Sequence, residues 1–136
     1  MALDLANYQD KVASAVKRFW QTRISSGDNR ASVVQGKHLD GFFDLITDLA
    51  TANGLPASSV RSKGDVVLPG YFRATKTWDV IVVHKENLIA AFEFKSQVGP
   101  SFGNNFNNRL EEAIGSATDL WRLSERELLA WCHARF

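Results

Sequence analysis

The sequence predicts a mixed α+β domain with N-terminal helices, a central antiparallel β-hairpin within a three-stranded sheet, and C-terminal helices. Three observations predict this order. Apolar residues recur at spacings of three and four before residue 55, two short β-branched runs flank residues 84–87, and the helical spacing returns after residue 105. A chain of 136 residues is expected to form one domain and to bury about two-thirds of its unfolded surface.

Two amphipathic helices are expected first, at Leu3 to about Ser25 and at about Leu39 to Asn53. The first helix carries basic residues that are solvated surface or, alternatively, phosphate contacts: Lys11, Lys17, Arg18 and Arg23. The second carries aspartates at intervals of four: Asp40, Asp44 and Asp48. These aspartates are exposed and structural, or one of them reaches the hairpin as a further ligand to a metal or a water.

The hairpin is predicted by two apolar runs, 78–83 and 88–95, whose β-branched and aromatic residues indicate largely buried strands. Two strands alone are marginally stable, so a third is required. Residues 66–73, interrupted by the turn dipeptide Pro69-Gly70, are the expected third strand.

Charged residues interrupt these apolar runs at Asp79, Glu93 and Lys95. Burial of a charge costs free energy, so charges at these positions indicate a function or a partner. Glu93 and Lys95 point to one face because they are two apart on a strand. A three-residue loop at 85–87 places Asp79 opposite Glu93, whereas a two-residue loop at 86–87 places it opposite Phe94. Asparagine at the end of the loop tolerates the left-handed conformation, so we expect an odd-length loop.

In that register two carboxylates and one ammonium converge. Carboxylates about 4 Å apart repel by roughly 1 kcal/mol in water and about 4 kcal/mol at an effective dielectric near 20. A shared proton, a paired cation or a metal relieves this repulsion, and Lys95 neutralises only one charge. Mg²⁺ binds through one or two carboxylates with waters and phosphate, and the lysine would orient or activate a water for attack on phosphorus. The alternative is a half-buried Asp/Lys/Glu ion network without a metal.

A known family carries the same residues. Asp79, thirteen residues, and then Glu93-Phe94-Lys95 match the metal-binding pattern of the PD-(D/E)xK nuclease superfamily, with Trp78 where a proline often stands. Residues 68–73, 76–79 and 93–109 resemble the XhoI family of type II restriction endonucleases, and the likeness covers most of residues 1–121.

The resemblance implies a restriction-endonuclease-like core that cleaves double-stranded DNA with Mg²⁺ at the palindrome CTCGAG. It implies a restriction–modification system with a cognate DNA methyltransferase. Asp79 and Glu93 would hold the metal, Lys95 would assist the nucleophilic water, and Gln97 would support this shell. A palindromic target also implies a twofold homodimer.

The amide-rich run after the hairpin is the best local candidate for DNA contact, because Asn and Gln can read adenine and Arg can read guanine. The candidates are Asn104, Asn105, Asn107, Asn108 and Arg109, with Arg73 and Lys76 as phosphate contacts. The alternative is that each asparagine only caps or turns the chain, with Asn104 or Asn105 as the helix cap. Arg73 and Lys76 are equally consistent with solvated surface charge.

The family likeness is expected to end near Trp121. The helix before it carries one apolar face: Phe106, Leu110, Ala113, Ile114, Ala117, Leu120 and Trp121. A capping box at 124–127 then predicts a short helix to the end. We therefore expect a partial restriction endonuclease domain over residues 1–121, lacking the distal strands, and a helical tail over 122–136.

Apolar surface on the hairpin and on the 106–121 helix is then expected to be exposed. The alternative function is a truncated, catalytically impaired DNA-binding or interaction remnant.

Composition limits the partners and the compartment that can be expected for this chain. A net charge of +1 provides no global attraction to nucleic acid, so any such attraction is local. Cys132 is the only cysteine, which is typical of a reducing cytoplasm. No apolar run approaches the roughly 20 residues of a membrane span, so no membrane partner is expected.

Overall fold

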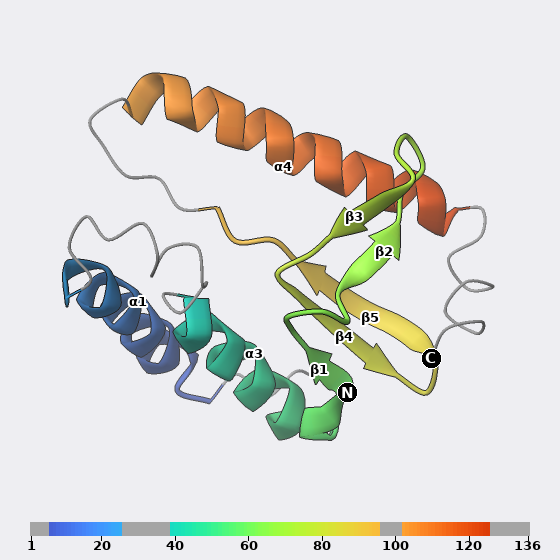
Figure 1. Ribbon diagram of the computed structural model, residues 1–136. Helices are drawn as coiled ribbons and strands as arrows, with labels where there is room; N and C mark the ends of the chain where they lie inside the picture. The colour runs from blue at the N-terminus through green and yellow to red at the C-terminus, as the bar shows by residue number, and fades with distance from the viewer. Residues whose placement is uncertain (1–5, 26–38, 96–101, 126–136) are drawn as a thin grey trace. The chain divides into compact units, whose positions relative to one another are not determined.

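The computed structural model describes residues 6–25, 39–95 and 102–125, and it divides into two compact units, residues 1–60 and 61–136. The first unit contains α1 (Tyr8–Ser25), α3 (Asp40–Ala52) and the short 3₁₀ helix η2 (Ala57–Ser59) (Figure 1). The remaining elements are β1 (Val60–Arg61), β2 (Val67–Pro69), β3 (Thr75–Thr77), β4 (Val80–His84), β5 (Asn87–Phe92) and α4 (Phe102–Ser124). The predicted mixed α+β class is confirmed. Among the described helices, none has the length and apolar character needed to cross a membrane.

The first unit is a pair of packed helices, as the two apolar stripes predicted. Phe19 of α1 is buried, and its ring centroid lies 6.2 Å from that of Phe42 on α3. Gly41 allows the close approach, because a Cβ at this position would lie 3.3 Å from the backbone oxygen of Ala15. The part of the first predicted helix before residue 6 lies outside the described residues.

The aspartates of α3 face the basic residues of α1. Arg18 is bonded to Asp44, and Lys11 Nζ lies 3.7 Å from Asp48 Oδ2. All four side chains are substantially exposed, so each pair contributes little to stability. Asp44 and Asp48 are therefore paired within their own unit, which favours the structural interpretation of these acids.

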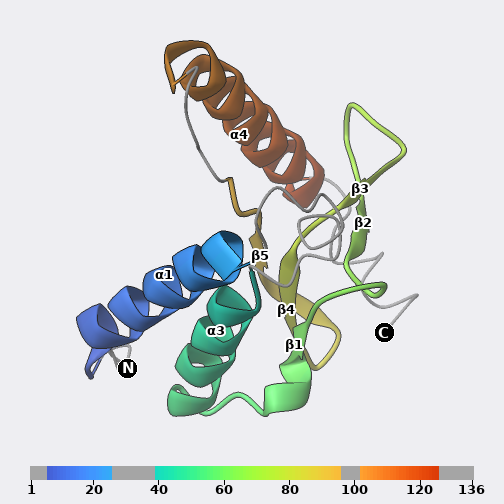
Figure 2. The same ribbon diagram turned by 60° about the vertical axis from the view of Figure 1, so that its left-hand side comes forward.

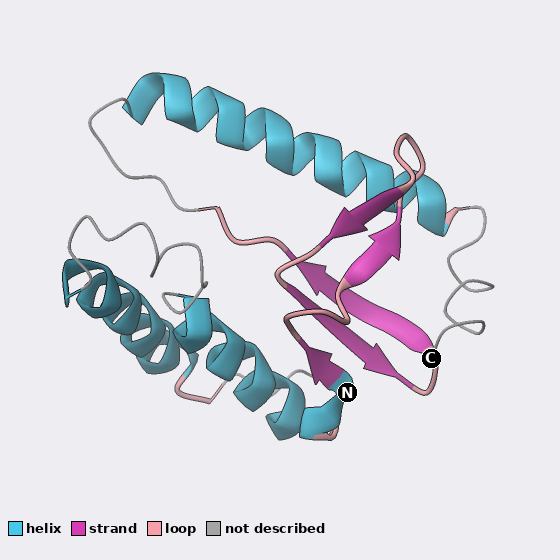
Figure 3. Ribbon diagram, in the orientation of Figure 1, coloured by secondary structure: helices cyan, strands magenta, loops and turns pink. Residues whose placement is uncertain are grey.

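The hairpin is formed by β4 and β5, and the sheet order is β1-β4-β5 (Figure 3). Val80, Ile81, Val82 and Val83 of β4 are all buried, as predicted. In contrast, β5 is an edge strand in which no residue is fully buried, and Ile89 is 55% exposed. The expectation of two largely buried arms is thus correct for β4 and wrong for β5, which has a strand neighbour on one side only.

The predicted three-residue loop is wrong, although the register that it was meant to produce is present. The turn has two residues, Lys85 and Glu86, both with left-handed φ angles of 48° and 65°. Consecutive left-handed residues match the twist of the flanking strands. A β-bulge then separates the pairs Val82↔Ala90 and Val83↔Leu88.

This bulge inserts one extra residue, Ile89, into β5. The insertion compensates for the shorter turn, so that Val80 lies opposite Phe92. The next pair along the ladder is therefore Asp79 with Glu93. The Asp79 amide donates to the Phe92 carbonyl at 3.1 Å, which extends the pairing to this point.

The third strand of this sheet is β1, so the prediction that residues 66–73 supply it is wrong. Instead, β2 pairs antiparallel with β3 in a separate two-stranded sheet, with Val67 opposite Thr77 and Pro69 opposite Thr75. The turn that begins at Gly70 reverses the chain, which gives β2 a partner nearby in the sequence. We call β2, β3 and the loop between them, residues 67–77, the β2–β3 ribbon.

A single core joins the ribbon to the hairpin. Its buried members are Val66, Leu68, Trp78, Ile81 and Val83, and Leu68 and Ile81 are fully buried. The Trp78 amide donates to the Val66 carbonyl at 2.9 Å, which ties the end of the ribbon to its beginning. Large buried apolar side chains of this kind stabilise a domain by about 1.5–3 kcal/mol each.

Helix α4 differs from the predicted helix at both ends. It begins at Phe102, so Asn104 and Asn105 lie within the helix and are not its cap. Ser124 ends this helix, with its hydroxyl donating to the Trp121 carbonyl at 2.7 Å. The remaining residues of the predicted tail, 126–136, lie outside the described residues. As expected, the apolar face of α4 is largely exposed: Phe106, Leu110, Ile114 and Trp121.

Candidate active site between the hairpin and α4

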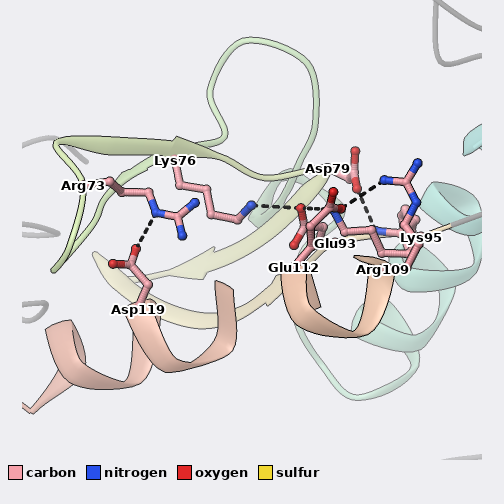
Figure 4. A network of polar contacts seen from close by, with 9 residues as sticks. Arg73, Lys76, Asp79, Glu93, Lys95, Arg109, Glu112 and Asp119 are labelled. Atoms are coloured by element: carbon pink, nitrogen blue, oxygen red, sulfur yellow. Dashed lines mark hydrogen bonds and ion pairs between the residues drawn. The ribbon is translucent and has the colours of Figure 1, made fainter. Parts of the chain in front are cut away.

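Glu93 follows β5 and is held by two lysines that come from different segments. Its Oε1 accepts hydrogen bonds from Lys76 Nζ at 2.9 Å and from Lys95 Nζ at 2.7 Å (Figure 4). Its side chain is only 17% exposed. Lys76 also lies over the ring of Trp78, with Nζ 5.0 Å from the ring centroid. The half-buried carboxylate thus has two cations on one oxygen, and it is the centre of this cluster.

Helix α4 closes the cluster from the other side. Lys95 Nζ lies 2.9 Å from Glu112 Oε2, and the same oxygen is 3.0 Å from Arg109 Nη1. The chain of contacts therefore runs from Lys76 through Glu93 and Lys95 to Glu112 and Arg109 (Figure 4). Charges alternate along this chain, so no group in it faces a like charge as its nearest neighbour.

The same contacts set the protonation states. Burial alone would raise the pKa of Glu93, but hydrogen bonds from Lys76, Lys95 and Ser116 outweigh it and lower the pKa to about 2. Burial would lower the pKa of Lys95, whereas its bonds to Glu93 and Glu112 raise it above the usual value. The pKa of Glu112 is lowered, chiefly by its hydrogen bond with Lys95. At neutral pH Glu93 and Glu112 are therefore ionised and Lys95 is an ammonium group.

Acid is expected to destabilise the fold through Glu93. Its folded pKa of about 2 lies below the ordinary value of 4.5, so its contribution is fully present above pH 4.5 and is lost as the pH falls toward 2. Allowing for partial solvent screening, we expect this loss to be about 1–3 kcal/mol. Urea unfolding followed by tryptophan fluorescence between pH 6 and pH 2 measures it.

The matched variant for this measurement is Glu93→Gln, which cannot titrate and should flatten the decline in unfolding free energy over that range. An unchanged decline in the variant would assign the acid sensitivity to other carboxylates.

Asp79 lies immediately before β4 and is bonded to the segment that carries the other two candidates. Its Oδ2 accepts a hydrogen bond from the amide of Phe94, the residue between Glu93 and Lys95, at 2.7 Å. Among the described residues, no ion pair joins Asp79 to either lysine. The structure therefore brings all three predicted residues to one end of the hairpin, but only Glu93 and Lys95 are paired directly (Figure 4).

Asp79 and Glu93 fit a minimal Mg²⁺ donor set, in which one or two carboxylates are completed by waters and phosphate. Asp79 Oδ1 is not used by the bond to Phe94, whereas Glu93 is already neutralised by two ammonium groups. Both lysines bind Oε1, so a cation that binds Glu93 through Oε2 would lie beside two positive charges. Within the described ranges, no group of three or more His, Cys, Asp or Glu side chains is placed to hold a metal ion.

An apolar cleft of about 380 Å³ opens beside the cluster, between β5 and α4. Glu93 and Lys95 are its charged lining residues, and its apolar lining includes Trp78, Leu88 and Trp121. The cluster is consequently not sealed in the core, and its charged groups can be reached from this side.

The predicted DNA contacts are placed unequally. Arg109 is half-exposed and bonded to Glu112, and Asn105, Asn107 and Asn108 are exposed on the first turns of α4. Arg73 is also half-exposed, whereas Lys76 is mostly buried against Glu93. The side chain of Asn104 and the whole of Gln97 lie outside the described residues.

Sequence reasoning missed the polar face of α4. Glu112, Ser116 and Asp119 are spaced by four and three residues and therefore share one face of the helix. Ser116 and Asp119 are buried, whereas the apolar face described above is exposed. The spacing of these three polar residues was the available signal, but it does not state which residues of another segment lie opposite them.

Comparisons with known proteins all match this chain to one family of proteins. The family model described as restriction endonuclease XhoI matches residues 20–132. The type II restriction enzyme AbrI of Azospirillum brasilense is 48% identical over 134 residues, covering 89% of this chain and 60% of that protein. The type II restriction enzyme XhoI of Xanthomonas vasicola is 49% identical over 131 residues, covering 88% and 53%.

A third relative, the type II restriction enzyme BstVI of Geobacillus stearothermophilus, is 52% identical over 98 residues, covering 68% of this chain and 44% of that protein. The chain thus spans about half the length of the curated relatives it matches. No solved structure matches the chain.

Proposed function

Because the chain belongs to the XhoI restriction endonuclease family, we propose that it is a site-specific endonuclease that hydrolyses phosphodiester bonds of double-stranded DNA. The mixed α+β architecture is consistent with a restriction-endonuclease-like core. One observation supports the proposal above the others. The half-buried Glu93 is paired with Lys95, and Asp79 is bonded to the backbone between them.

In this proposal Mg²⁺ is the cofactor, and Asp79 and Glu93 hold it. When bound, the ion supplies charge stabilisation to the oxygens of the reacting phosphate. Lys95 has a raised pKa and is therefore an ammonium at neutral pH, so it can donate hydrogen bonds but cannot accept a proton. Its role is to orient the nucleophilic water and to stabilise developing negative charge. Gln97 would support these groups, as the family pattern implies.

The proposed target is CTCGAG, read by a twofold homodimer with one active site for each strand. The exposed asparagines of α4 and Arg109 are the proposed base and phosphate contacts, together with Arg73 and Lys76. Such an enzyme would act in the cytoplasm beside a cognate DNA methyltransferase that protects the host sequence. The division into a nuclease domain over 1–121 and a helical tail over 122–136 remains a proposal as well.

A second candidate function is DNA binding without efficient cleavage. The observation that favours it is the full neutralisation of Glu93 by Lys76 and Lys95, which opposes the binding of a metal ion at this carboxylate. In that case the chain would retain the DNA contacts of the family while its active site remained an ion-pair network.

Cleavage of a supercoiled plasmid that carries a single CTCGAG site tests the proposal. We expect Mg²⁺-dependent conversion to the linear form, with no cutting in EDTA or of a plasmid in which the site reads CTCCAG. Asp79→Ala should abolish cutting, because it removes one of two proposed metal ligands. Glu111→Ala, an exposed acid of α4, is the matched control and should cut normally.

The two candidate functions give different results in this assay. Salt-sensitive retardation of DNA on a gel, with the plasmid left uncut, would support the binding function and contradict the nuclease. Failure to retard DNA at low salt would contradict both.

A further inference from the structure

The loop at the tip of the β2–β3 ribbon is held by one buried carboxylate. Asp119 of α4 is 2% exposed, and its Oδ1 accepts hydrogen bonds from the amides of Tyr71 at 3.0 Å and Phe72 at 2.7 Å. Its Oδ2 lies 3.3 Å from Arg73 Nε (Figure 4). Three consecutive loop residues are therefore bound to a single side chain.

Gly70 makes this arrangement possible. A Cβ at Gly70 would lie 2.7 Å from Asp119 Oδ2 and 2.7 Å from the Arg73 carbonyl oxygen, so any other residue would force the loop away from the carboxylate. The Gly70 amide donates to the Ala74 carbonyl at 3.4 Å, which closes the loop. The loop thus has a defined shape, and it extends beyond its strands (Figure 2).

The bonds from Asp119 hold the loop in a shape that leaves two aromatic side chains exposed to solvent. Phe72 is 68% exposed and Tyr71 is 39% exposed, and their ring centroids lie 4.7 Å apart in an edge-to-face arrangement. Burial of a carboxylate costs free energy that its partners must offset, and here those partners are all in the loop. The product of this arrangement is a rigid loop with an exposed aromatic pair at its tip.

The loop carries one basic side chain and no acidic one, since residues 70–74 contain Arg73 and neither Asp nor Glu. Lys76 is neutralised by Glu93, but Arg73 uses only Nε for Asp119, and its side chain is 44% exposed. A half-exposed guanidinium beside exposed aromatic rings favours a nucleic acid over a protein partner.

We propose that Phe72 is a DNA-contacting residue and that the tip of the β2–β3 ribbon enters a groove of the bound duplex. A two-stranded ribbon fits the major groove, and aromatic side chains can pack against bases or wedge between base steps. Arg73 contacts the neighbouring phosphate through its free amino groups. Asp119 is a positioning residue, since it touches the loop and not the DNA. This inference rests on DNA being the ligand, as proposed above.

Fluorescence anisotropy with a CTCGAG duplex, in EDTA to prevent cutting, tests the role of Phe72. We expect Phe72→Ala to raise Kd at least about tenfold, whereas Phe72→Trp, which keeps an aromatic ring, should restore most of the affinity. The slope of log Kd against log salt should not change, because no phosphate contact is lost. Arg73→Gln should instead lower that slope by about one.

A second readout reports on the bases directly. With 2-aminopurine in place of the adenine of the site, wild-type protein should increase the fluorescence on binding, because the base step is partly unstacked. Phe72→Ala should lose this increase. Ile114→Ala, which also removes an exposed apolar side chain, is the matched control and should behave as wild type.

The outcomes separate this inference from the proposed function. Equal Kd and equal 2-aminopurine signals for wild type and Phe72→Ala would overturn the inference while leaving DNA binding intact. Absence of DNA binding by the wild-type protein would overturn both. If Phe72→Ala left DNA binding unchanged but abolished self-association in sedimentation, the loop would be a protein interface and the inference would be wrong.

Discussion

Replacement of Glu93 with glutamine is expected to lower the rate of DNA cleavage by about 100- to 1,000-fold, without weakening DNA binding. Glutamine keeps the size of the side chain but removes the charge that Lys76 and Lys95 share. One proposed metal ligand becomes a weaker donor, and Lys95 loses a partner that raises its pKa. Loss of one such electrostatic contact in an active site typically costs this factor. DNA affinity should persist because no phosphate contact is removed.

Single-turnover cleavage of a radiolabelled duplex, with binding measured separately in EDTA, distinguishes the two effects. Glu111→Gln makes the same chemical change at an exposed position of α4 and should leave the rate unchanged. A Glu93→Gln protein that cleaves at the wild-type rate would show that the chemistry resides elsewhere in the chain.

Substitution of Asp119 with alanine is expected to lower the free energy of unfolding by about 2–4 kcal/mol. The change leaves the amides of Tyr71 and Phe72 without their acceptor and Arg73 without its partner. Asp119→Asn keeps an acceptor for both amides and removes only the charge, so we expect a smaller loss of about 1–2 kcal/mol. Urea denaturation at pH 7, followed by tryptophan fluorescence, measures both values.

Glu112→Ala is the matched control, because it removes an exposed acid from the same face of α4. Its effect should stay within about 0.5 kcal/mol, as is usual at exposed positions. A loss below about 0.5 kcal/mol for Asp119→Ala would mean that water replaces the carboxylate at the loop, and that the loop does not depend on α4 for its shape.

The elements of the fold were predictable where a local pattern repeats. The spacing of apolar residues predicted α1 and α3 to within a few residues, apart from residues outside the described ranges. A run of β-branched residues predicted the buried strand β4. The isolated charges at Asp79, Glu93 and Lys95 indicated one end of the hairpin as the place of the proposed chemistry, since a charge beside a buried run needs a partner.

Long-range choices were not predictable in the same way. The third strand of the sheet is β1, because β2 pairs instead with β3, which is its neighbour in the sequence. The turn is shorter than predicted, and the bulge at Ile89 restores the register. A two-residue turn with this bulge gives the same strand pairs from Val82 back to Val80 as a three-residue loop without a bulge. The pattern of apolar residues in the sequence therefore could not distinguish the two arrangements.

Local patterns in the sequence predicted α1, α3, the buried hairpin strand, the family, and the place of Asp79, Glu93 and Lys95 at one end of the hairpin. Each of these depends on neighbours along the chain or on a motif of fixed spacing. The contacts in space show which cations neutralise Glu93, and they show that Ser116 and Asp119 of α4 are buried. These contacts join residues 17 and 48 positions apart, such as Lys76 with Glu93 and Tyr71 with Asp119. They form because buried charges and amides must find partners in space, and the sequence does not state which partners are near.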